Sequence, residues 1–298
     1  MPCVRCRNDL LRVSAEFLVG ANAPQRMDRV RPRLWPYNPA SSPVALPEVD
    51  VLYTSSEVVP LTASTTSAPD DVFDLDALRS WAETLQDDQG ARLGDLLNAE
   101  GAAPLDQRRP FLMLGELANP FRLACLQAEA VPILRVRLEG LCRTWTDSQD
   151  ARHIQPGLHH VTLARTPGWW EEAHLGLLSP KEMKRFTMWL AQDRQGDWRG
   201  VRVAEGGLRL EHAPLDPPAI EDVTWDGSVE RVERAAPAPT GAGIDLASVM
   251  VPVHARRGCY DHRGRLARCV HLPQRAFHEG VFRRGSARDW SDVLDTLG

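Results

Sequence analysis

The spacing of apolar residues changes near residue 196, and this change sets the strongest limit on the fold. Upstream, the apolar residues behind Asp74 recur at three- and four-residue intervals: Leu75, Leu78, Ala82 and Leu85. This interval predicts a helix that is capped by Asp74 and buries one stripe. Two more helices are predicted to begin where a capping residue precedes a proline, at Asn119 and at Ser179. The middle of the chain is therefore expected to be largely helical.

Beyond residue 196, apolar and polar residues alternate, which predicts strands. Residues 201–210 are expected to form a hairpin that turns at two glycines, with Val203 facing Leu210. Residues 249–272 are expected to form a second hairpin that turns at 261–264. The alternation of residues 134–139 predicts one strand inside the helical middle. The expected fold class is α+β, with a helical middle region and a β-rich C-terminal third built from hairpins.

The length allows one large domain or two ordinary ones. We expect a mixed α/β lobe with a helical middle over residues 1–195. A β-rich lobe with an arginine-rich hairpin is expected over residues 196–298. The stretch 235–243 is rich in alanine, proline and glycine and is a possible alternative boundary.

Several function classes are excluded by missing motifs. The chain has only two lysines, Lys181 and Lys184, and neither follows a glycine, so a phosphate-binding P-loop is excluded. The nucleophile elbow, the His-Glu-x-x-His zinc motif, the EF-hand loop and the dinucleotide-binding glycine motif are missing too. No apolar run reaches about 18 residues, so no membrane span is predicted. Six irregularly spaced cysteines and no signal peptide predict free thiols and a cytoplasmic location.

Charge is unevenly distributed along the chain. Residues 46–100 carry twelve acidic residues against two arginines, whereas residues 254–288 carry nine arginines against two acidic residues. Such asymmetry is typical of an anion-binding face, or of two surfaces that attract each other. Acidic and basic segments that pack side by side within one monomer would show the same pattern.

The arginine-rich ribbon is the predicted working surface of a non-catalytic binding protein. Arginine forks suit phosphate and carboxylate geometry, so the expected partner is nucleic acid or an acidic protein surface in a larger assembly, with no membrane involved. The predicted contact residues are Arg256, Arg263, Arg265, Arg268, Arg275, Arg283 and Arg284. Self-association of the acidic and basic segments into a structural scaffold is an alternative.

A metal- or histidine-dependent enzyme is another alternative, with no catalytic residue assigned. Two ligand sets of the type that zinc takes can be drawn. One combines residues near both ends of the chain: Cys3, Cys6, Cys259 and His262. The other follows from the second hairpin, in which His254 faces His271 and both share a face with Cys269. Free thiols and solvated histidines would explain the same residues, so the expected cofactor is none, with zinc as the alternative.

Aromatic and thiol residues in the middle of the chain suggest more local roles. Trp169 and Trp170, if helical, point in different directions, which leaves one of them available as an interface anchor. Cys125 and Cys142 lie among apolar residues and are expected to be buried, inert thiols. His159 and the histidine after it are expected to flank a strand.

Overall fold

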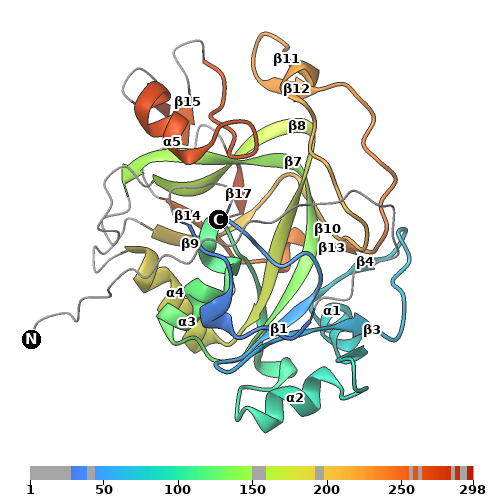
Figure 1. Cartoon of the computed structure of the whole chain (residues 1–298). Helices are drawn as coiled ribbons and strands as arrows, with labels where there is room; N and C mark the ends of the chain where they lie inside the picture. Colours follow the sequence, from blue (N-terminus) through green and yellow to red (C-terminus); the bar gives the residue numbers. More distant parts are fainter. Residues whose placement is uncertain are drawn as a thin grey trace, which may run out of the picture.

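Two long antiparallel strands organise the molecule in the computed structural model. β7 (Val131–Gln149) pairs with β8 (His159–Leu178) over almost its whole length (Figure 1). The two strands belong to a ten-stranded sheet. The structure describes residues 28–38, 44–149, 159–191, 198–254, 258–260, 264–282, 286–288 and 294–297.

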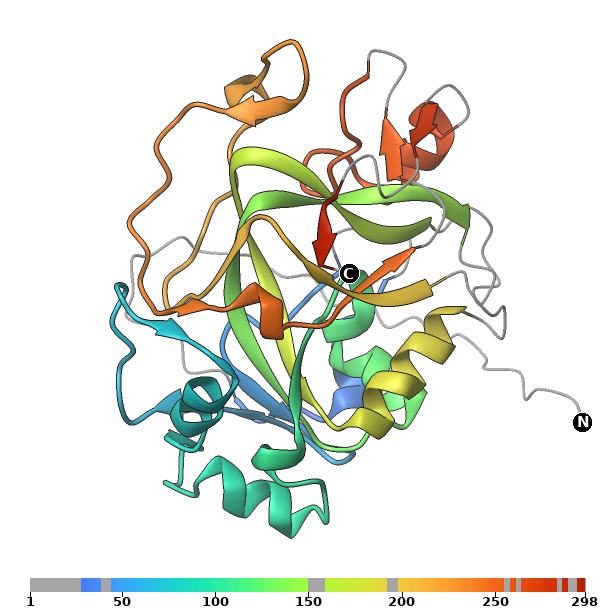
Figure 2. The ribbon, with the colours of Figure 1, turned by 180° about the vertical axis from the view of Figure 1, so that it is seen from behind.

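The strands next to β7 and β8 form a closed path in which neighbours are hydrogen-bonded, except that β9 (Trp198–Val203) and β10 (Gly207–Leu210) are joined by the chain itself. β8 pairs with β6 (Arg109–Leu112), and Met250 connects β6 to β14 (Val251–His254) by donating to the Pro110 carbonyl and accepting from the Leu112 amide. β14 pairs with β9, which turns at Gly206 into β10. β10 pairs with β7, so the path returns to its starting strand, as in a small barrel (Figure 2).

The inward-facing side chains of this closed path are apolar and buried. They come from all six strands: Leu112, Leu134, Val136, Leu138, Leu175, Leu177, Val203, Leu208, Leu210, Val251 and Val253. Successive side chains of a strand point to opposite faces, so every second residue of each strand reaches this interior. Complete burial of one such side chain stabilises the fold by about 1.5–3 kcal/mol.

Helices cover the outside of the path where β7 begins and β8 ends. α3 (Pro120–Leu126) and α4 (Pro180–Ala191) pack there, with the Phe186 ring edge-on to Phe111 at 6.2 Å between centroids. α1 (Leu75–Ala82) and α2 (Leu93–Ala99) lie at the lower end in Figure 1, and their leucines join the interior cluster. β1 (Val51–Tyr53) pairs with the first residues of β7 and with β2 (Val58–Pro60).

Short strands and turns complete the described fold. β3 (Thr62–Ala63) pairs with β5 (Leu85–Gln86), β4 (Val72–Phe73) with β13 (Gly243–Ile244), and β11 (Val223–Trp225) with β12 (Glu230–Val232). β15 (Gly258–Tyr260) lies between β7 and β16 (Ser286–Arg288), and β17 (Thr296–Leu297) pairs with β9. α5 (Gln274–Ala276) continues into one π-helical turn (Phe277–Val281). The 3-10 turns are Pro32–Leu34, Leu105–Gln107, Gly115–Ala118, Ile220–Asp222 and Leu246–Ser248.

The expected helical middle is wrong, because strands dominate and β7 and β8 occupy most of residues 131–178. The chain is mixed α/β around a large sheet. The predicted helix starts are confirmed: Asp74 accepts from the Ala77 amide, Asn119 from the Arg122 amide and Ser179 from the Glu182 amide. The missed strand β8 is buried on both faces over most of its length, so its sequence shows no alternation.

Both predicted hairpins are also wrong. β9 and β10 pair with different strands, so Val203 lies opposite Thr296 and Leu210 lies opposite Val136. β14 pairs with β9, and residues 266–269 pair with the edge of β7. Alternation fixes which side chains share a face of a strand, but it does not fix which strand lies beside it.

Strands from both sides of residue 195 share one sheet. β10 and β13, which come after this position, are hydrogen-bonded in the same sheet as β4 and β7, which come before it.

Trp169 and Trp170, expected on a helix, lie in β8 and are both buried. Cys142 is buried as expected, whereas Cys125 is exposed, contrary to expectation.

Candidate functional site

A large bulge in β8 interrupts the β7–β8 ladder. Glu139 pairs with Trp170 and Leu141 with Arg165, so Gly140 alone stands opposite residues 166–169 of β8. Gly140 and Gly168 both have positive φ angles, of 71° and 75°, which glycine adopts without strain. Bulges bend a strand and change the direction of its side chains. Thr166 and Trp169 therefore leave the regular ladder.

The β11–β12 hairpin packs directly on this bulge. A Cβ atom at Gly168 would lie only 2.0 Å from the Val232 carbonyl oxygen, so the two backbones are in close contact. The hairpin turn is held by Asp226, whose carboxylate accepts from the amides of Ser228 and Val229. This docking places Glu230 of β12 beside the bulge.

Three segments form the walls of the site: the β8 bulge, the β11–β12 hairpin, and residues 264–272, which lie along the edge of β7. The Trp145 amide donates to the Ala267 carbonyl at 3.0 Å, and the Cys269 amide donates to the Arg143 carbonyl at 2.9 Å. Ala267 and Cys269 join an apolar cluster with Trp145. The alternate residues, Leu266 and Arg268, contact the bulge and the hairpin instead, because they point to the opposite face.

Arg268 connects the three walls. Its Nη1 pairs with Glu230 Oε2 at 2.8 Å, and its Nη2 donates to Thr166 Oγ1 at 3.2 Å. The guanidinium lies over the Trp169 ring at 5.0 Å, an arrangement that favours a cation. Glu230 Oε2 also accepts from the Leu266 amide at 3.0 Å. The Arg268 side chain is only 3% exposed.

Two buried donors beside this network have no acceptor among the described residues. They are Arg268 Nε and Trp169 Nε1, which belong to the stacked guanidinium and indole. A buried donor without an acceptor costs about 1–3 kcal/mol. The site therefore holds hydrogen-bonding capacity that the fold itself does not use.

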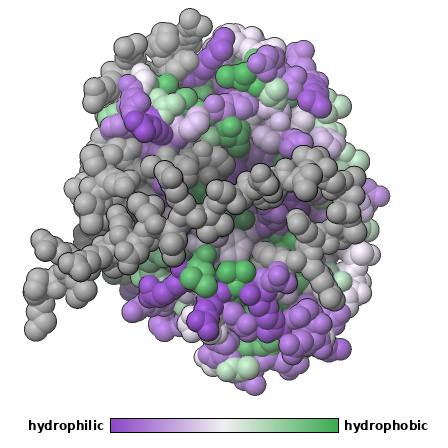
Figure 3. Space-filling model, in the orientation of Figure 1, coloured by the Kyte–Doolittle hydropathy of each residue, from purple (hydrophilic) through white to green (hydrophobic). Residues whose placement is uncertain are grey.

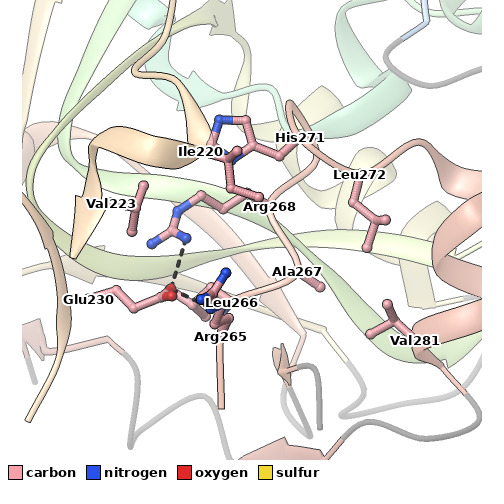
Figure 4. Close-up of a pocket in the computed structure, with 10 residues that line it drawn as sticks. All are labelled: Ile220, Val223, Glu230, Arg265, Leu266, Ala267, Arg268, His271, Leu272 and Val281. Atoms are coloured by element: carbon pink, nitrogen blue, oxygen red, sulfur yellow. Dashed lines mark hydrogen bonds and ion pairs between the residues drawn. The ribbon is translucent and has the colours of Figure 1, made fainter. Parts of the chain in front are cut away.

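A pocket of about 150 Å³ opens next to Arg268 (Figure 4). Its polar lining consists of Glu230, Arg265, Arg268 and His271. Its apolar lining consists of Ile220, Val223, Leu266, Ala267, Leu272 and Val281. Figure 4 shows the Arg268 side chain reaching from the 264–272 segment toward Glu230 across the centre of this lining. The site thus combines charged side chains, of which Glu230 and Arg268 are paired, with an apolar wall.

His271 has a defined tautomer at the rim of the pocket. Its Nε2 lies 2.8 Å from the Pro218 carbonyl oxygen, which can only accept, so Nε2 carries the proton. The ring is edge-on to Trp169, with 5.4 Å between centroids. These contacts fix the imidazole against the same indole that stacks on Arg268.

The structure brings three of the predicted residues, Arg265, Arg268 and His271, to this one pocket. Arg265 is exposed, and Arg275 is exposed and pairs with Glu279 at 2.9 Å. The remaining predicted contact arginines lie outside the described residues: Arg256, Arg263, Arg283 and Arg284.

The predicted zinc ligands are not assembled in the described part of the chain. Cys3, Cys6 and His262 lie outside it, as does the side chain of Cys259. His254 stacks on His160 and packs against Trp198, Cys269 joins the Trp145 cluster, and His271 contacts Trp169. No three His, Cys, Asp or Glu side chains gather as a possible metal site within the residues that the structure describes.

The histidines at the start of β8 form two pairs. His159 Nε2 lies 3.0 Å from His278 Nδ1, and His159 Nδ1 lies 3.0 Å from the Thr146 carbonyl oxygen, to which it donates. His160 stacks on His254 from the opposite face of the strand. The sequence placed both histidines beside a strand, whereas they are the first two residues of β8.

The two buried cysteines near the bulge are protonated thiols. Burial raises the pKa of Cys142 to about 11 and holds the pKa of Cys269 well above its usual value. Because the thiolate is the reactive form, neither sulfur is an activated nucleophile at neutral pH.

Sequence reasoning missed Val223 and Glu230, which the hairpin brings to the pocket, and Thr166, which holds Arg268 from the bulge. The Asp226 and Gly227 turn between two short alternating segments could have identified the β11–β12 hairpin. Nothing local in the sequence indicates that this hairpin packs on residues 166–169.

Comparisons with models of protein families, with curated proteins and with solved structures found no match to this chain. Among the described residues, no helix has the length and apolar character needed to cross a membrane. The function is therefore inferred from the site itself.

Proposed function

We propose that the protein is a non-catalytic binding protein, one component of a larger assembly, and that it contacts an acidic protein partner. The proposed contact surface is the β11–β12 hairpin together with residues 264–272. The observation that carries this proposal is the pocket, in which Arg265 and Arg268 lie beside apolar side chains. Arginine and large apolar anchors are enriched at the centres of protein interfaces.

Two exposed apolar side chains beside the pocket support a protein partner. Ile220 is 50% exposed and Trp225 is 55% exposed, and both lie on or next to the hairpin. In Figure 3, apolar residues appear among hydrophilic ones at this upper end of the molecule. Tryptophan is a frequent anchor in interfaces because it buries a large area with little loss of conformational entropy.

The local charge favours a protein partner over nucleic acid. In the hairpin region, Arg231 pairs with Asp226 and Arg234 pairs with Asp222. The exposed Glu221 and Glu233 lie beside them. A phosphate backbone is bound by many exposed basic side chains, whereas the rim of a protein interface accommodates both acidic and basic side chains. Arg268 is paired with Glu230 and does not face a phosphate backbone.

We place the protein in the cytoplasm as part of the same proposal. The described cysteines, Cys125, Cys142 and Cys269, are free thiols, which is typical of a reducing compartment.

The test is fluorescence anisotropy with the full-length chain and four labelled probes. The probes are a soluble peptide of glutamate, leucine and serine, its lysine counterpart, a single-stranded RNA and a DNA duplex. We expect the acidic peptide to bind most tightly, with an affinity that falls as salt rises past the screening range. Trp225→Ala and Arg265→Ser should each weaken binding at least fivefold.

Matched controls lie on other surfaces. Met188 is as exposed as Trp225, and Arg109 is exposed on β6, so Met188→Ala and Arg109→Ser should leave binding unchanged. Tight binding of RNA or DNA with a steep salt dependence, and none of the acidic peptide, would contradict the proposal.

A further inference from the structure

We infer that the pocket beside Arg268 takes one uncharged, apolar side chain of the partner, of about the size of a benzene ring. The inference rests on the proposed function and deepens it, because it names the group that anchors the acidic partner at the centre of the contact surface. The cores of protein interfaces are depleted of charged residues, whereas their rims are polar.

The size of the pocket limits its occupant. A cavity of about 150 Å³ with aliphatic walls holds one benzene-sized molecule and is too small for a nucleotide or a folded segment. A single leucine or phenylalanine side chain therefore fits, whereas the segment that carries it stays outside.

The apolar walls of the pocket come from separate elements. Val223 begins β11, Leu266 and Leu272 lie in the segment 264–272, and Val281 ends the π-helical turn. In Figure 4, Val223 lies on one side of the lining, and Leu272 and Val281 lie on the other. An apolar occupant is therefore removed from water on both sides by aliphatic carbon, which favours its binding.

The charged groups of the lining already have partners. Arg268 pairs with Glu230 at 2.8 Å, and the exposed Arg265 has an interaction partner as well. The Arg268 Nε donor is buried and lies out of reach of an occupant. A charged occupant would lose its water without gaining a partner of opposite charge, so the pocket favours an uncharged one.

The surroundings of the pocket indicate that its occupant belongs to a protein. Ile220, which is part of the lining, is 50% exposed, and Trp225, two residues from Val223, is 55% exposed. A partner that inserts a side chain into the pocket can cover both, whereas a free small molecule would leave them in water. The pocket and these two side chains together have the composition of an interface core.

The first part of the test measures the preference of the pocket with two small probes. The full-length chain with isotope-labelled methyl groups is titrated with benzyl alcohol and with benzoate, its charged counterpart, and is followed by NMR. We expect benzyl alcohol to shift the methyl signals of Val223, Leu266 and Val281 with a dissociation constant of about 1 mM, at least tenfold below that of benzoate. The methyl signals of Val72, which is exposed on β4, should not move.

Variants of one wall residue test the place of binding. Val223→Trp fills the pocket and should abolish the binding of benzyl alcohol, and the milder Val223→Ala should weaken it at least threefold. Val72→Trp and Val72→Ala are the matched controls and should change nothing, because Val72 is 69% exposed and does not line the pocket.

The second part of the test identifies the occupant with the acidic peptide of glutamate, leucine and serine. Replacing its leucines by alanine should weaken binding to the wild-type chain at least fivefold. The Val223→Trp chain should bind both peptides equally, because the leucine has lost its pocket.

Benzoate binding as tight as that of benzyl alcohol, or no methyl shift with benzyl alcohol, would overturn the inference. So would benzyl alcohol binding that both Val223 variants retain. The two proposals fail separately. An acidic peptide that binds equally well with leucine or with alanine would overturn the inference alone, whereas benzyl alcohol binding without binding of either peptide would overturn the proposed function.

Discussion

The two halves of the β7–β8 pair, on either side of Gly140 and Gly168, differ in where their buried charges come from. Below the bulge, the inward side chains are apolar, as at Leu134 and Val136, and buried charge lies on the outer face of the same two strands, where Arg135 pairs with Glu172. At the bulge, the buried pair of Glu230 and Arg268 comes from two other segments that pack on the strands. One strand pair thus supports an apolar scaffold at one end and a polar site at the other.

The difference follows from the ladder itself. Where the pairing of β7 and β8 is regular, every second side chain must face the interior, and only apolar residues fill it without a partner. Where residues 166–169 bulge out, this constraint is lifted, and Thr166 and Trp169 face another segment of the chain. Buried charge is tolerated there because the hairpin and residues 264–272 supply partners.

The largest expected effect comes from removing the contact that joins the hairpin to the bulge. Gly168→Ala places a Cβ atom 2.0 Å from the Val232 carbonyl oxygen and adds strain at a φ of +75°. We expect a loss of about 4 kcal/mol in the free energy of unfolding, or failure to fold, measured by urea denaturation.

Gly227→Ala is the control for this substitution. Gly227 also has a positive φ, of +104°, and lies in the turn of the same hairpin, but nothing lies within 4 Å of the added Cβ. This variant should lose only about 1–2 kcal/mol in the free energy of unfolding, because backbone strain is its only cost. Equal losses for the two glycines would show that the hairpin does not dock on the bulge.

A smaller effect is expected from breaking the charged pair at the pocket. Glu230→Gln leaves Arg268 without its carboxylate and should lower the free energy of unfolding by about 3 kcal/mol. The double variant with Arg268→Met removes both charges and should recover part of this loss in the same urea titration. A double variant less stable than Glu230→Gln alone would show that Arg268 stabilises the fold without its partner.

The smallest expected effect concerns Asp50, on the scaffold side of the comparison, and its contribution to the free energy of unfolding depends on pH. Burial raises the pKa of Asp50, which accepts from the Arg135 amide, to about 7. A raised pKa means that the stability contributed by Asp50 is complete below its ordinary pKa of 3.8 and is lost as the pH rises through about 7. Asp50→Asn should therefore gain roughly 1.4 kcal/mol over wild type for each pH unit between pH 5 and pH 7.

His174 on the same outer face should respond in the opposite direction. Burial lowers its pKa to about 4, and its Nε2 donates to the Pro47 carbonyl, so its contribution is present above pH 6.5 and is lost as the pH falls through about 4. The exposed Asp70→Asn is the control and should follow wild type throughout. A flat difference between Asp50→Asn and wild type would show that Asp50 ionises normally in the folded chain.

The sequence predicted the parts of the fold that local chemistry determines. Asp74, Asn119 and Ser179 each cap a helix through a hydrogen bond to an amide three residues away, so the signal and the structure lie in the same segment. The length of β8 was not predicted, because both of its faces are buried and its sequence therefore shows no alternation of apolar and polar residues. β9 and β10 were assigned to each other because alternation is the same whichever strand is the neighbour.

The candidate site was accessible from the sequence only in part. Arg265, Arg268 and His271 stand close together in the chain, and their residue types suggested binding. Glu230 reaches the pocket through the docking of the hairpin on the bulge, and Thr166 of the bulge binds Arg268, so both contacts join segments far apart in sequence. The same contact explains why Arg268, predicted to face a partner, is mostly buried inside the protein.

The most direct test of this division into scaffold and site is amide hydrogen exchange of the full-length chain. We predict the slowest exchange in residues 134–138 and 173–177, and faster exchange in residues 220–232 and 264–272. Faster exchange in the interior strands than in the hairpin would contradict the account.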